Sequence, residues 1–75
     1  MQERIRAVMA QIFNVEPASI SADSSPESIE RWDSLRHMQL VLAIEDEFGV
    51  QFPDEDIPEL LSPLAIETRL SSLSP

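Results

Sequence analysis

Apolar residues near the start of the chain recur at the three- and four-residue spacing of an amphipathic helix. The polar residues between them fall on the opposite side of such a helix. We therefore predict a first helix over residues 2–14. Its apolar positions are Ile5, Val8, Met9, Ile12 and Phe13.

Residues 15–32 lack a repeating pattern, because serines and prolines interrupt it throughout. Isolated apolar residues remain at Val15, Ile20 and Ile29. We expect these side chains to pin a long loop to the core. An ordered loop of this length in a small domain is often functional.

The strongest helical pattern covers residues 33–49. Asp33 or Ser34 can cap its start, and Gly49 is a typical residue at which a helix ends. Residues 50–53 then form a short extended link, because Pro53 disfavours the helical conformation of the residue before it.

The remaining chain predicts one short and one longer helix. Pro58 limits residues 54–60 to a short third element. Ser62 followed by Pro63 is typical of a helix start, and the apolar residues beyond predict a last helix over 63–73. The predicted fold is all-α: a small four-helix bundle in one domain, 1–75, with a long loop between helices one and two.

Two apolar stripes share the helix predicted over residues 33–49. One consists of Leu40, Val41, Ile44 and Phe48 and is expected to face the core. The other, formed by Leu35, Met38 and Leu42, lies about a third of a turn or more away. Either the helix is buried on two sides, or the second stripe is a protein-docking strip rimmed by polar residues, among them Gln39, Glu45 and Asp46.

Charge narrows the range of partners. The chain has 14 acidic residues, five arginines and no lysine, for a net charge of −9. We therefore expect no binding to nucleic acid or anionic membranes. Acids at the end of the central helix oppose the helix dipole, so stability alone does not favour them there. The acidic pattern as a whole indicates a basic protein partner.

Other chemistry finds little support in the sequence. The chain lacks cysteine, and its only histidine, His37, is expected to face solvent. The acids at 54–56 lack the spacing of a calcium-binding loop, so we predict neither a metal site nor catalytic residues. No signal peptide or membrane-spanning run is recognisable, which favours a cytoplasmic protein.

The triplet Asp33-Ser34-Leu35, at the start of the central helix, resembles the motif of acyl carrier proteins. The resemblance extends through residues 39–48, which end in an acidic stretch and a phenylalanine, and through residues 52–56. It covers nearly the whole chain: the first helix, the long loop, this triplet and a short acidic third element.

The resemblance implies that Ser34 is the attachment site for 4′-phosphopantetheine, transferred from coenzyme A by a separate phosphopantetheinyl transferase. The thiol of that arm would carry acyl groups as thioesters to enzymes of fatty-acid, polyketide or other specialised acyl biosynthesis. These acyl-loading and acyl-transferring enzymes would carry basic patches. The predicted docking residues are Asp33, Leu35, Arg36, Met38, Gln39, Leu42, Glu45 and Asp46.

Three features depart from the family pattern. Arg31 and Trp32 precede the Asp-Ser pair where a glycine is frequent, and Trp32 is expected to pack over the loop. Arg36 stands where fatty-acid carriers often have an acid, which favours a specialised pathway. Pro58 and Pro63 stiffen the third element and its exit, so a cavity for a long acyl chain is not assured.

The leading hypothesis is a free-standing, monomeric acyl carrier. An aminoacyl or peptidyl carrier would have the same sequence features. An acidic helical adaptor that carries no prosthetic group is the alternative from another class, because it would use the same apolar strip and acidic rim.

Overall fold

A computed structural model describes residues 1–73, and within this range every regular element is helical. It therefore confirms the predicted all-α fold with a long loop after the first helix. The last two residues of the predicted domain lie outside the described part. The elements are α1 (Gln2–Phe13), the 3-10 turn η1 (Pro17–Ser19), α2 (Ser34–Phe48), the 3-10 segment η2 (Asp54–Glu59) and α3 (Pro63–Leu73).

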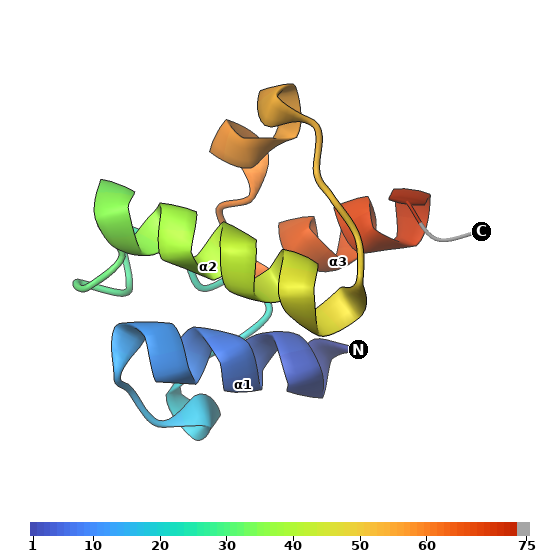
Figure 1. Ribbon diagram of the computed structural model, residues 1–75. Helices are drawn as coiled ribbons and strands as arrows, with labels where there is room; N and C mark the ends of the chain where they lie inside the picture. The colour runs from blue at the N-terminus through green and yellow to red at the C-terminus, as the bar shows by residue number, and fades with distance from the viewer. Residues whose placement is uncertain (74–75) are drawn as a thin grey trace.

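The three α-helices enclose the core, and η2 lies at one side of it. In Figure 1, α1 and α2 lie one above the other and run in opposite directions, with α3 beside them and η2 above α2. The short third element is a 3-10 segment, with Pro58 inside it. Proline lacks the N–H that an α-helical turn needs at that position. Within the described residues no helix is long and apolar enough to cross a membrane.

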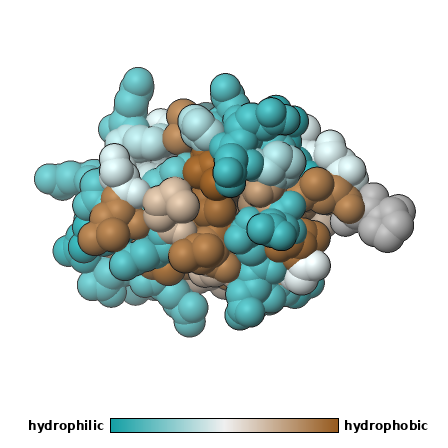
Figure 2. All heavy atoms as spheres, turned by 45° about the horizontal axis from the view of Figure 1, so that its top comes forward, coloured by the Kyte–Doolittle hydropathy of each residue, from teal (hydrophilic) through white to brown (hydrophobic). Residues whose placement is uncertain are grey.

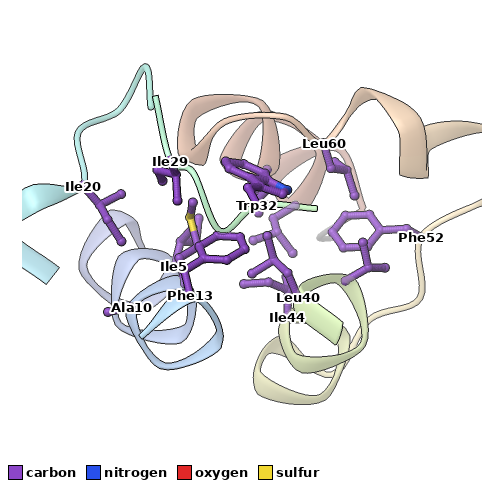
Figure 3. Close-up of a cluster of buried hydrophobic side chains, with 14 residues drawn as sticks. Ile5, Ala10, Phe13, Ile20, Ile29, Trp32, Leu40, Ile44, Phe52 and Leu60 are labelled. Atoms are coloured by element: carbon purple, nitrogen blue, oxygen red, sulfur yellow. The ribbon is translucent and has the colours of Figure 1, made fainter. Parts of the chain in front are cut away.

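The core draws side chains from every α-helix and from the connections between them (Figure 3). Burying a Leu, Ile or Phe side chain contributes roughly 1.5–3 kcal/mol to stability. The largest fully buried side chains, none more than 1% exposed, include Ile5, Met9, Phe13, Leu40, Ile44, Leu60, Ile66 and Leu70.

The long loop is ordered by its own serines and by two buried isoleucines. Ile20 and Ile29 are buried, and Val15 packs at the edge of the core, so the predicted pinning is confirmed. The Ser24 hydroxyl accepts a hydrogen bond from the Ser21 backbone N–H at 2.9 Å. Such side-chain bonds take the place of the backbone partners that a helix would provide.

Further contacts tie the loop to its surroundings. The Leu64 N–H of α3 donates to the Ala22 carbonyl at 3.1 Å. At the loop surface, the Ser21 hydroxyl donates to the Asp23 carboxylate at 2.6 Å and lowers the pKa of that acid. The long loop is therefore anchored both to the core and to α3.

The acidic end of α2 has structural roles that the charge pattern does not indicate. A Glu45 carboxylate oxygen accepts the Phe52 N–H at 2.8 Å. Glu47 forms an ion pair with Arg4 of α1 at 2.9 Å, and the Arg4 guanidinium lies 4.5 Å from the centre of the Phe48 ring. Two of the three acids at this helix end therefore make contacts within the chain that the charge pattern does not indicate.

Candidate functional site

Asp33 caps the start of α2. One of its carboxylate oxygens accepts the Arg36 backbone N–H at 2.8 Å, and the other accepts the Arg36 guanidinium at 2.9 Å. Of the two candidate caps, Asp33 is therefore the one used, and Ser34 is the first residue of the helix. The guanidinium–carboxylate pair also balances the positive charge that the sequence places beside Ser34.

The Ser34 hydroxyl is exposed and makes no hydrogen bond to any residue in the range 1–73. The N–H groups of the first helical residues, Ser34 and Leu35, have no carbonyl partner within an α-helix. Together with the positive end of the helix dipole, they suit a phosphate ester at this hydroxyl. The residues present therefore fit a phosphopantetheine group.

A second serine at a helix start provides a comparison. The Ser62 hydroxyl, half-buried at the start of α3, accepts the Ala65 N–H at 3.0 Å and so caps that helix. Ser34 leaves this task to its neighbour Asp33. Of these two helix-start serines, only Ser34 presents an exposed hydroxyl that the helix cap does not use.

A largely apolar groove of about 440 Å³ lies beside Ser34. This volume falls within the range of small-molecule binding sites, roughly 300–1,000 Å³. Figure 2, which turns the η2 side of the molecule forward, shows apolar atoms gathered in a band between hydrophilic groups. The groove is lined by Pro26, Trp32, Asp33, Ser34, His37, Met38, Ile57, Pro58 and Leu61.

His37 connects two walls of this groove. The Trp32 indole N–H donates to its Nδ1 at 2.9 Å, and its Nε2 lies 2.8 Å from the Ile57 carbonyl oxygen. Because the indole can only donate, Nδ1 accepts, and the neutral imidazole donates from Nε2. The prediction that His37 faces solvent is wrong: its side chain is half-buried and joins α2 to η2.

Trp32 lies deeper than the sequence predicts. Only 6% of it is exposed, and its ring centre lies 5.0 Å from that of Phe13 in α1. Figure 3 shows the indole near the middle of the buried cluster, with its nitrogen on the side of Leu60. Trp32 is thus both a core residue and a wall of the groove.

The second apolar stripe of α2 is exposed. Leu35, Met38 and Leu42 are 70%, 44% and 60% exposed, whereas Leu40, Val41 and Ile44 on the core face are at most 2% exposed. Burial of the helix on both sides is thereby excluded. The exposed stripe begins beside Ser34.

The polar residues of the predicted docking surface differ in how they are held. Gln39 and Asp46 are exposed, whereas Arg36 and Glu45 are half-buried and engaged within the chain. Asp33 is exposed and also caps the helix. Their part in docking remains a prediction.

The sequence does not single out the η2 side of the groove. Ile57, Pro58 and Leu61 line it, and Leu61 is 43% exposed. The signal that was available is Ile57 directly before Pro58, with Leu60 and Leu61 after Glu59, in an otherwise acidic stretch.

Comparisons with known proteins agree with this geometry. The family model described as a phosphopantetheine attachment site matches residues 3–70. An acyl carrier protein of Thermosynechococcus vestitus is 34% identical over 58 residues, which cover 77% of this chain and 72% of that protein. Acyl carrier proteins of two Treponema pallidum strains are 46% identical over 56 residues, 75% of this chain and 72% of each relative.

The helical fold, the cap that leaves a serine hydroxyl exposed and the match over most of the chain lead to one assignment. The chain belongs to the acyl carrier protein family and contains its phosphopantetheine attachment domain.

Proposed function

We propose that Ser34 carries the 4′-phosphopantetheine arm and that the chain holds acyl groups as thioesters at the thiol end of this arm. One observation supports this assignment above the others: the Ser34 hydroxyl is exposed at the first residue of α2, with its neighbour Asp33 serving as the helix cap. A protein without cysteine also offers no thiol of its own to exchange with a thioester.

The chain's own part in the modification is to present a hydroxyl. The Ser34 oxygen would form a bond to the phosphorus of the pantetheine phosphate, and the adenosine bisphosphate part of coenzyme A would leave. The hydroxyl proton would pass to a base of the transferase, so no catalytic residue is assigned to this chain. The exposed N–H groups at the start of α2 would stabilise the resulting phosphate diester.

The same proposal assigns the exposed stripe of Leu35, Met38 and Leu42 to docking of the transferase and of acyl-handling enzymes. Apolar contacts would form the centre of such an interface, and the surrounding acids would attract basic groups at its rim. Acyl cargo is favoured over aminoacyl cargo by the net charge of −9 and by the names of the relatives.

Modification tests the assignment directly. The purified chain is incubated with coenzyme A and a broad-specificity phosphopantetheinyl transferase, and its intact mass is measured. We expect the mass of one phosphopantetheine to be added. Ser34→Ala should gain nothing, and fragment masses should place the group on the peptide containing Ser34.

Ser62→Ala is the matched control, because it removes the other serine hydroxyl at a helix start. This variant should still be modified once, although the loss of its cap costs about 1 kcal/mol of stability. A wild-type chain that stays unmodified with several transferases would support the adaptor without a prosthetic group. Modification of Ser34→Ala would place the site elsewhere.

A further inference from the structure

Of the residues that line the groove, Trp32 is the one that is buried in the core. Trp32 lines the groove beside Ser34 and meets the buried ring of Phe13, 5.0 Å away between ring centres. With 6% of its surface exposed, Trp32 forms a wall between the groove that it lines and the core residues that it contacts. The core residues beyond it, Leu40 and Ile44 among them, are packed and almost fully buried.

A pair of hydrogen bonds holds this wall against η2. His37 accepts the indole N–H and donates to the Ile57 carbonyl, at 2.9 and 2.8 Å. The imidazole and indole rings are also stacked, with centres 6.0 Å apart. Moving η2 away from α2 to admit a chain would break the bond to Ile57 and leave its carbonyl with only the longer bond from the Leu60 N–H, at 3.3 Å. The His37 ring nitrogen would also lose its partner, and losing a hydrogen bond at a half-buried group is costly.

Most side chains that line the groove are apolar. The polar exceptions are Asp33, Ser34 and His37. Asp33 is already hydrogen-bonded to Arg36. His37 is already hydrogen-bonded to Trp32 and Ile57. The groove therefore suits an apolar group that lies on the surface and offers little to a charged one.

We propose that Trp32, held by His37, allows only short acyl groups to lie in the groove beside Ser34, and that longer chains carried on Ser34 extend into solvent or into a partner enzyme. This inference rests on the proposed function. Trp32 is the specificity-determining residue, and His37 is the positioning residue that acts through it and through Ile57.

The experiment uses the chain loaded by a transferase from acetyl-, butyryl-, hexanoyl-, octanoyl- and dodecanoyl-coenzyme A. For each form the midpoint of thermal unfolding and the retention on a hydrophobic-interaction column are measured. In the wild type, the midpoint should rise for the shortest groups and stop rising at octanoyl. Retention should increase steeply from octanoyl onward, because the chain is exposed.

Two variants relax the wall without emptying the core. Trp32→Phe keeps an aromatic ring against Phe13 and removes the N–H and part of the bulk. His37→Leu keeps apolar volume and removes both hydrogen bonds. In each variant, the midpoint of thermal unfolding should keep rising for acyl groups of octanoyl length and longer. Column retention of the octanoyl form should be lower than in wild type.

His37→Gln tests whether the hydrogen bonds matter beyond packing, because an amide offers both an acceptor and a donor. Unlike His37→Leu, this variant should show the same dependence of unfolding midpoint and retention on acyl chain length as wild type. Gln39→Ala, an exposed change on α2 outside the groove, should leave that dependence unchanged.

The wild-type series decides the proposal even if a variant fails to fold. A midpoint that keeps rising to dodecanoyl, with no increase in retention, would overturn it by showing that long chains are enclosed. If Trp32→Phe and His37→Leu show the same dependence on chain length as wild type, these two residues do not limit the acyl groups in the groove. Failure to load any group on Ser34 would instead contradict the proposed function, so the two failures are distinct.

Discussion

The two apolar faces of α2 have similar residues but opposite surroundings. Leu40, Val41 and Ile44 lie against α1 and the core and are at most 2% exposed. Leu35, Met38 and Leu42 are equally apolar, yet between 44% and 70% of their surface meets solvent. Composition alone does not separate a face that stabilises the fold from a face available to a partner.

The difference lies in what covers each face. The loop and the two other α-helices supply side chains to the inner face. The outer face is open to solvent except at Met38, which borders the groove next to η2. Apolar surface left exposed in a small acidic protein contributes little to its folding and is typical of a binding site. The two faces should therefore respond in opposite ways to mutation, in stability on one side and in partner binding on the other.

The largest effect is expected from shortening a leucine on the inner face. Leu40→Ala should lower the free energy of unfolding by about 2–5 kcal/mol, because it leaves a cavity in the core. Leu42→Ala makes the same chemical change on the outer face and should cost about 0.5 kcal/mol or less. Urea unfolding followed by circular dichroism measures both. Equal losses would contradict the comparison.

A smaller loss of stability is expected at the cap, where an exposed residue has a structural role. Asp33→Ala should cost about 1 kcal/mol, because the Arg36 N–H loses its acceptor. Asp33→Asn keeps an acceptor and gives up only an exposed ion pair, so it should stay close to wild type. If both substitutions cost the same in urea unfolding, the ion pair rather than the cap stabilises the helix start.

The outer face should affect partners with almost no change in stability. Met38→Glu and Leu42→Glu should each leave the unfolding free energy within about 0.5 kcal/mol of wild type. Both should slow loading by partner enzymes, measured as the initial rate of phosphopantetheine transfer. Leu42 does not line the groove, so slowing in both variants identifies docking as the cause. Unfolding of Met38→Glu would instead place Met38 in the core.

Added salt should produce the smallest effect, a weaker affinity for partner proteins, because it screens only the acidic groups at the rim of the docking surface. Partner affinity, measured by titration calorimetry, should weaken as ionic strength rises, because screening acts over about 10 Å at 0.1 M salt. The unfolding free energy should change much less, since the Arg4–Glu47 and Arg36–Asp33 ion pairs are exposed and such pairs contribute little to stability. Affinity independent of salt would mean that the acids are only solvated.

The helices were predictable because their signals are local. Apolar spacing, a cap at Asp33 or Ser34 and Gly49 at the end place α2 within one residue of its observed bounds. Gly49 indeed adopts a left-handed conformation with φ of 64°. The same signals place Ser34 at the helix start, but they leave open whether Asp33 or Ser34 is the cap, and the structure decides for Asp33.

The rest depends on residues distant in sequence. Arg4 and Glu47, 43 positions apart, meet only because α1 and α2 pack together. The contact of Trp32 with Phe13 and the bond from His37 to Ile57 likewise require the folded chain. A local pattern places His37 on a helix surface, but it cannot indicate that η2 lies over it.

Trp32 also gives the molecule a spectroscopic reporter. It is the sole tryptophan of the sequence, so fluorescence excited at its absorption edge arises from one indole. That indole is shielded from water, bonded through its nitrogen to an imidazole, and lies within the wall beside Ser34. A shift in its emission wavelength would follow the opening of the bundle at this point without any attached dye.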